Sequence, residues 1–167
     1  LPVLGQGSHT LTATATDVAG NVSTVSTPGV VVIDTTPPAQ ISSITVTDNK
    51  TPITGPVGSG GDTNDPSPIL SGRAEAYSTV NVYNGSTLIG TGKADVNGNW
   101  SLAPTVALPD GNYSLTATAT DAAGNVSDNS PVFNVTVDTV APVTPGVMSV
   151  TDDTGTIVGP VTNGGVT

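Results

Sequence analysis

Apolar and polar residues alternate along several short stretches of the chain, and turn-forming residues separate these stretches. Alternation with a period of two is typical of strands that bury one face. Asn84-Gly85 and Asn97-Gly98 lie between consecutive stretches and favour tight hairpin turns. Seven short strands separated by turns predict an all-β fold, an immunoglobulin-like seven-strand β-sandwich. The expected strands are residues 41–47, 68–74, 79–83, 87–94, 99–102, 113–120 and 132–137.

The same pattern recurs along the chain with a period of 104 residues. Leu11-Thr-Ala-Thr-Ala-Thr-Asp17 recurs at 115–121, and Ala19-Gly-Asn-Val-Ser23 recurs at 123–127. A period this long indicates whole domains in tandem array, because solenoid units are much shorter. Neighbouring repeats of the same chain are therefore the expected partners. We expect the C-terminal strands of a preceding repeat in 1–35, a complete repeat in 36–138, and the N-terminal strand and loop of a following repeat in 139–167.

The composition excludes several other classes of protein. The chain has 13 acidic and only 3 basic side chains, giving a net charge of −10, so nucleic acid is not an expected partner. No apolar run approaches the roughly 18–20 residues that a membrane span needs. There is no cysteine, so a disulfide framework is impossible. Aromatic residues make up 3% of the chain, which predicts a thin core.

Enzymatic chemistry has little support in the sequence. Residues 108–113 resemble a tyrosine corner, and His9 takes the position of Tyr113 in the partial repeat. We therefore expect this single histidine to be structural. There is no cysteine and no nucleophile elbow. Glu75 and Asp95 could mimic a glycosidase carboxylate pair, but no aromatic cleft accompanies them. We expect no enzyme.

Acidic residues gather at one pole of the predicted sandwich. The loops after the second, fourth and sixth strands share the pole where the complete repeat begins, and the preceding repeat enters there through a Thr-Thr-Pro-Pro linker. Oxygen ligands without histidine or cysteine suit Ca²⁺, which takes about 6–8 oxygens. The sequence therefore predicts a Ca²⁺ site at this junction, formed by Asp34, Glu75, Asp95, Asp121 and Asn125.

A second, weaker acidic cluster is expected at the opposite pole. Asp48, Asp62 and Asp65 belong to the loop between the first two strands, which faces the junction near Asp138. The glycines of 58–61 allow backbone carbonyls to turn inward. A simpler interpretation stays open for both clusters, because aspartate also favours ordinary solvated turns, where its carboxylate bonds nearby backbone.

Three motifs resemble a known family. Thr-Ala-Thr-Asp-x-Ala-Gly-Asn-Val-Ser at 118–127, Val-Asp-Thr-x-x-Pro at 137–142 and Ala-Asp-x-Asn-Gly-Asn-Trp-Ser at 94–101 are similar to the bacterial immunoglobulin-like repeats of giant secreted adhesins. Biofilm-associated proteins and type I-secreted adhesins belong to this group. The resemblance covers essentially the whole chain and implies extracellular, Ca²⁺-binding repeats that form a stalk on the bacterial cell surface.

The resemblance also implies site residues. The family's junction acids would fall on Asp34, Glu75, Asp95 and Asp121. The chain departs from the commoner repeat at Ala76-Tyr-Ser, where glycine often follows Glu-Ala, and at Asn64-Asp65, where two aspartates are frequent. Nothing in the motifs identifies an adhesion target.

The expected function is mechanical. Ca²⁺ that bridges the terminal Asp34 of one repeat to the loops of the next would stiffen the joint, and the prolines of the linker would restrict it further. The alternative is a ligand-binding module for carbohydrate or a surface. In that reading, exposed threonine rows make the contact, at positions 12, 14 and 16 and at positions 116, 118 and 120.

Overall fold

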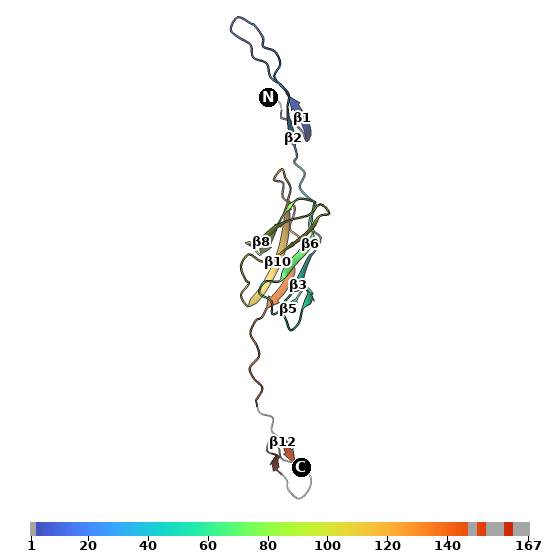
Figure 1. Cartoon of the computed structure of the whole chain (residues 1–167), viewed down its shortest axis with the longest axis vertical. Helices are drawn as coiled ribbons and strands as arrows, with labels where there is room; N and C mark the ends of the chain where they lie inside the picture. The colour runs from blue at the N-terminus through green and yellow to red at the C-terminus, as the bar shows by residue number, and fades with distance from the viewer. Residues whose placement is uncertain (1–2, 147–149, 153–158, 162–167) are drawn as a thin grey trace.

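Short β-strands account for all the regular structure in the described part of the chain. The computed structural model describes residues 3–146, 150–152 and 159–161. These residues form thirteen strands, and none of them belongs to a helix. Accordingly, the described residues hold no helix that could cross a membrane. An N-terminal hairpin is followed along the chain by a β-sandwich (Figure 1). The predicted all-β class is confirmed.

The sandwich consists of two packed sheets. One has the strand order β4-β3-β6-β9 and the other has the order β5-β11-β10-β7-β8. All neighbours pair antiparallel except β5 and β11, which run parallel. The bounds of the first sheet are β3 Ile44–Asp48, β4 Gly55–Val57, β6 Ile69–Arg73 and β9 Asn99–Leu102. Those of the second are β5 Gly61–Thr63, β7 Thr79–Asn84, β8 Thr87–Lys93, β10 Gly111–Thr120 and β11 Phe133–Val137.

Each of the seven predicted strands has a counterpart, and two short strands add to them. The extra strands β4 and β5 lie in a segment that the sequence predicts to be a loop. Its glycines and proline obscure the alternation that would indicate strands. β4 is an edge strand, the position in a sheet where its Pro56 is tolerated. The first predicted strand starts later than expected, at Ile44. Ile41 is fully buried but lies before the first paired residue.

Glycines make room for the few large side chains of the core. Trp100 lies directly across from Gly72 on the neighbouring strand. A Cβ on Gly72 would lie 2.9 Å from the Trp100 ring and 2.9 Å from the Ser43 carbonyl. A Cβ on Gly90 would lie 2.6 Å from Leu102. The strands therefore approach closely around Trp100 and Leu102, and a larger residue at either glycine would clash. The fully buried side chains of the core include Ile41, Val46, Leu70, Val80, Val82, Leu115 and Val135.

The tyrosine corner is present. The Tyr113 hydroxyl donates a 2.6 Å hydrogen bond to the Pro109 carbonyl, four residues earlier. In the N-terminal hairpin, His9 Nε2 lies 2.7 Å from the Gly5 carbonyl, again four residues earlier. The histidine thus performs the structural role that the sequence predicts for it.

The N-terminal hairpin reproduces part of the sandwich. β1 (Gly7–Leu11) pairs with β2 (Gly29–Ile33) in the register of β10 and β11, shifted by 104 residues. Leu11 is 49% exposed, whereas its counterpart Leu115 is fully buried. The hairpin therefore presents the face that β10 and β11 bury against the other sheet.

A second correspondence exists at the other end of the described chain. β12 (Val150–Asp152) pairs with β13 (Gly159–Val161) in the register of β3 and β4, shifted by 104 residues. The remaining residues of the third predicted unit, 147–149, 153–158 and 162–167, lie outside the described residues. The division of the chain into three repeats stays a prediction.

Candidate functional site

One turn motif supplies two of the three aspartates of the first predicted cluster, Asp95 and Asp121. The segments Asp17–Asn21, Asp95–Asn99 and Asp121–Asn125 share the sequence Asp-x-x-Gly-Asn and the same hydrogen bonds. In each, Oδ1 of the aspartate accepts the backbone N–H groups two and four residues later. Oδ2 accepts the side-chain amide of the asparagine. The glycine of each turn has φ between 82° and 94°, where residues with a Cβ are strained.

These turns keep their aspartates ionised. The Asn125 side-chain amide is the largest influence that holds the pKa of Asp121 below its ordinary value. At Asp95 the largest influence is the backbone N–H of Asn99, with a smaller contribution from the charge of Arg73. Three N–H donors occupy most of the roughly four acceptor positions of each carboxylate. Each turn therefore offers an anion with about one acceptor position left for a further ligand.

Asp34, Asp121 and Asn125 form one connected group. The Asn125 side-chain amide donates to Asp121 Oδ2 at 2.8 Å and to the Asp34 carbonyl at 3.1 Å. The latter bond joins residues 91 positions apart and links the loop after β10 to the linker that precedes β3. Asp34 Oδ1 accepts the backbone N–H of Thr36 and the side-chain amide of Gln6. The structure thus brings together three of the five residues predicted for the junction.

The turns that contain the other two residues, Glu75 and Asp95, are joined by a backbone hydrogen bond. The Tyr77 N–H donates to the Asp95 carbonyl at 3.4 Å, and the Glu75 carbonyl accepts both the N–H and the hydroxyl of Ser78. Glu75 lines a shallow depression of about 300 Å³ together with Arg73. Among the residues that the structure describes, no three acidic, histidine or cysteine side chains gather into a group that could hold a metal ion.

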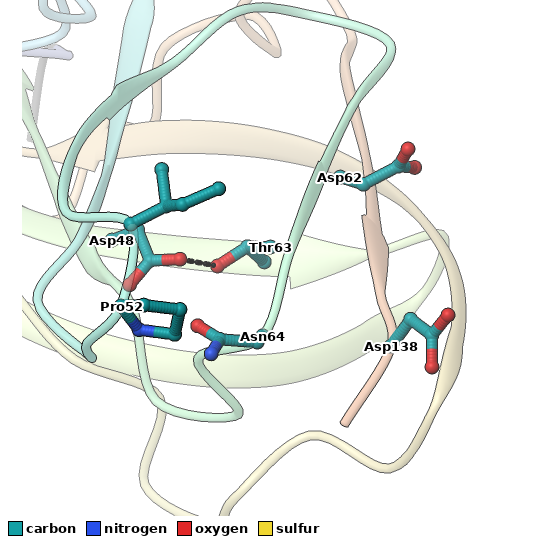
Figure 2. Close-up of a pocket in the computed structure, with 7 residues that line it drawn as sticks. Asp48, Pro52, Asp62, Thr63, Asn64 and Asp138 are labelled. Atoms are coloured by element: carbon teal, nitrogen blue, oxygen red, sulfur yellow. Dashed lines mark hydrogen bonds between the residues drawn. The ribbon is translucent and has the colours of Figure 1, made fainter. Parts of the chain in front are cut away.

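Three residues of the second cluster line one cavity. Asp48, Asp62 and Asp138 border a space of about 260 Å³, together with Pro52, Ile53, Thr63 and Asn64. Asp48 is 5% exposed; its carboxylate accepts the Thr63 hydroxyl at 2.6 Å and the Lys50 N–H at 2.7 Å. Figure 2 shows Asp48 pointing toward Thr63, whereas the side chains of Asp62 and Asp138 point away from Asp48.

Asp65, the fourth residue of that cluster, accepts hydrogen bonds from the backbone of its own loop. It is 4% exposed, and its two carboxylate oxygens accept the backbone N–H groups of Ser67 and Asn49. It therefore holds the local turn and does not line the cavity. Asn64 does line it; its Oδ1 is buried and accepts no hydrogen bond from the described residues.

Sequence reasoning missed a pair of serines that extend the sheet beside β10. Ser127 donates its N–H to the Ala119 carbonyl, and its hydroxyl oxygen accepts the Ala119 N–H. Ser130 does the same with Ala117. Ser23 and Ser26 repeat these contacts in the N-terminal hairpin. The signal was the Ser-x-x-Ser spacing, which recurs with the period of 104 residues.

The alternative function rests on two threonine rows, and they differ in exposure. Thr12, Thr14 and Thr16 are all exposed, whereas the row on β10 is not. Thr118 is only 7% exposed, and Thr116 and Thr120 on the same face of β10 are half-buried. A continuous array of exposed hydroxyls is therefore absent from β10.

Comparison with known proteins identifies the class of domain. The family model for the bacterial Ig-like domain matches residues 40–139, which is more than half of the chain. The chain belongs to this family, and the predicted immunoglobulin-like sandwich is confirmed.

The other comparisons add little. One solved structure, the BSP domain of a biofilm-associated protein, is similar to the chain with 22% sequence identity and a TM-score of 0.38. The match covers 80% of this chain but only 26% of that structure, so the chain spans about a quarter of its length. No match was found among curated proteins.

Proposed function

We propose that the chain is part of the stalk of a large extracellular bacterial adhesin, in which immunoglobulin-like repeats act as spacers. The observation that carries this proposal is the set of hydrogen bonds that recurs after 104 residues, in the turns, the serine contacts and the strand registers. Membership of the bacterial Ig-like family supports it. The net charge of −10 favours a soluble, self-repelling chain that stays extended.

Within this function, Ca²⁺ would stiffen the joint between repeats. At the first pole, Asp34, Asp121 and Asn125 would hold the ion, with Glu75 and Asp95 drawn in from the adjacent loops. The ligand chemistry fits Ca²⁺, because all five residues offer oxygen atoms. The Asn125 amide nitrogen uses its two donors on Asp34 and Asp121, which leaves Oδ1 free to act as a ligand.

The cavity at the second pole would take an ion through Asp48, with the side chains of Asp62 and Asp138 turning toward it from their orientation in Figure 2. The open Oδ1 of Asn64 supports this assignment, because a buried oxygen without a donor would gain from a cation.

The chain itself already restricts the joint. The two prolines of the linker fix their own φ angles and disfavour helical backbone before them. Pro38 is buried against the sandwich, which anchors the linker at its second end. A bound cation would supply the attraction between Asp34 and the acidic loops that otherwise repel it. Extracellular modules bind Ca²⁺ with Kd on the order of 10⁻⁴–10⁻³ M, so external Ca²⁺ would load the joint.

Thermal unfolding of the full chain in about 5 mM Ca²⁺, in matched Mg²⁺ and in EDTA tests this proposal. An ion that binds only the folded state raises the melting temperature. We expect a rise specific to Ca²⁺ in the wild type and a much smaller one in Asp121→Asn. Asp17→Asn is the matched control, because Asp17 has the same turn without the contact to the linker. Superimposed curves in Ca²⁺ and EDTA would contradict calcium binding.

A further inference from the structure

The exit from each repeat is held by one side chain. After β11, Thr139 donates its N–H and its hydroxyl to Asp110 Oδ1, at 3.0 and 2.8 Å. After β2, Thr35 donates the same two groups to Gln6 Oε1, at 2.8 and 2.7 Å. Both contacts join residues 29 positions apart and are related by the shift of 104 residues. The linker therefore leaves each repeat along a path set by a side chain from the loop before the penultimate strand.

The two exits differ in how many bonds that side chain makes. The Gln6 amide nitrogen also donates to Asp34 Oδ1 and to the Thr36 hydroxyl, both at 3.0 Å. Its two lone pairs and two N–H donors are thus all used. A carboxylate can only accept, so Asp110 has no donor for Asp138. Val140, the counterpart of Thr36, has no hydroxyl to offer. The first exit has four such bonds and the second has two.

We propose that positions 6 and 110 are the positioning residues of the linkers, and that Gln6 locks the first exit without a cation. Only the consequence for a stalk of several repeats rests on the proposed function. At the first exit, the neutral amide of Gln6 donates a hydrogen bond to the Asp34 carboxylate. At the second exit, two carboxylates, Asp110 and Asp138, accept the N–H groups of consecutive residues, so two negative charges lie close together. The exits of one stalk would then differ in how firmly the start of the linker is held, according to whether glutamine or aspartate occupies this position.

Amide hydrogen exchange measured by NMR on the full chain in EDTA tests the lock. Gln6→Glu keeps the acceptor for Thr35 but removes both donors, and we expect exchange at Thr35 and Thr36 to speed up about tenfold, as for the loss of more than one hydrogen bond. The converse pair Asp110→Gln with Val140→Thr installs the missing donors, and exchange at Thr139 should slow about fivefold. Ladder amides of β1 and β2 serve as the control for folding of the hairpin.

Unchanged exchange in both variants would overturn the lock. Fast exchange at the Thr35 amide of the wild type, while the β1–β2 amides are protected, would overturn it as well. Fast exchange at the β1–β2 amides of the wild type would also overturn it. These failures are distinguishable from failure of the proposed function, because the lock is measured in EDTA. A calcium-specific rise in melting temperature can persist when the lock fails, and the lock can persist when that rise is absent.

Discussion

The side-chain amide of Asn125 donates a hydrogen bond to the main-chain carbonyl of Asp34, 91 residues earlier in the chain. This bond ties the loop after β10 to the linker that enters the sandwich. It lies at the pole where the acidic loops of the repeat meet, so the geometry of the joint depends on a residue within the Asp-x-x-Gly-Asn turn.

Truncation of Asn125 should weaken the sandwich. Asn125→Ala removes the donors to Asp121 and Asp34, and we expect the free energy of unfolding to fall by about 1–2 kcal/mol. Urea titration followed by Trp100 fluorescence measures this, because the single tryptophan lies in the sandwich core. The matched change Asn21→Ala lies in the hairpin and should leave the Trp100 transition in place. Equal effects of the two changes would contradict the role of the Asp34 contact.

The turn aspartates predict how stability depends on pH. Hydrogen bonds to the ionised form lower the pKa of Asp95 and Asp121 in the folded state. Their stabilisation is therefore fully present above the unfolded pKa, near 4, and is lost as the pH falls through the folded pKa. Asp95→Asn should be less stable than the wild type at pH 7 and should approach it near pH 2.

Urea titrations between pH 2 and pH 7, again followed by Trp100, measure this dependence. Asp17→Asn in the hairpin is the control and should leave the Trp100 profile unchanged. A constant difference between Asp95→Asn and the wild type at every pH would show that the carboxylate bonds do not shift the pKa.

Tyr77 carries backbone strain. It is the one non-glycine residue with positive φ in the described part of the chain, at 65°, and its ring is 69% exposed. Hydrogen bonds from Ser78 to the Glu75 carbonyl hold the backbone of the turn in this conformation. Because the ring is exposed, its packing does not compensate for the strain. Tyr77→Gly should stabilise the sandwich by about 1 kcal/mol, whereas Tyr77→Ala keeps a Cβ and should not. Chemical denaturation compares them, and a gain for alanine equal to that for glycine would contradict the account.

Gly72 is required for the packing of Trp100. A methyl group there would meet the ring and the Ser43 carbonyl at 2.9 Å, and we expect Gly72→Ala to cost about 1–3 kcal/mol. Gly58→Ala is the control, because no atom lies within 4 Å of its added Cβ. Similar stability of the two variants in urea would show that the strands adjust without cost.

Much of the fold follows from local pattern. Alternating stretches and Asn-Gly turns predict the seven principal strands, and the period of 104 residues predicts that the hairpin repeats β10 and β11. β4 and β5 escape the prediction because Gly55, Pro56 and Gly61 break the alternation, and their pairing depends on distant strands. The late start of β3 reflects pairing, since burial of Ile41 alone does not place it in a ladder.

The candidate site is less predictable, because it depends on which acceptor positions are already used. The sequence places Asp121, Asn125 and Asp34 at one pole, and the structure joins them. It does not reveal that Asp65 is occupied by two backbone N–H groups. Likewise, Gln6 and Asp110 carry no local signal and are recognised only through Thr35 and Thr139, 29 residues away.

The central claim is that Ca²⁺ stiffens the joint, and the absence of cysteine allows a direct measurement. Spin labels attached at Ser8→Cys on β1 and Thr45→Cys on β3 report the distance between the hairpin and the sandwich by pulsed electron paramagnetic resonance. Both positions are exposed. The Gln6 contacts hold only the start of the linker, at Asp34, Thr35 and Thr36, so the rest of the linker can still bend. The account therefore predicts a broader distance distribution in EDTA and Mg²⁺ than in Ca²⁺, and this narrowing by Ca²⁺ should be lost in Asp121→Asn. A distribution of the same width in all three conditions would contradict it.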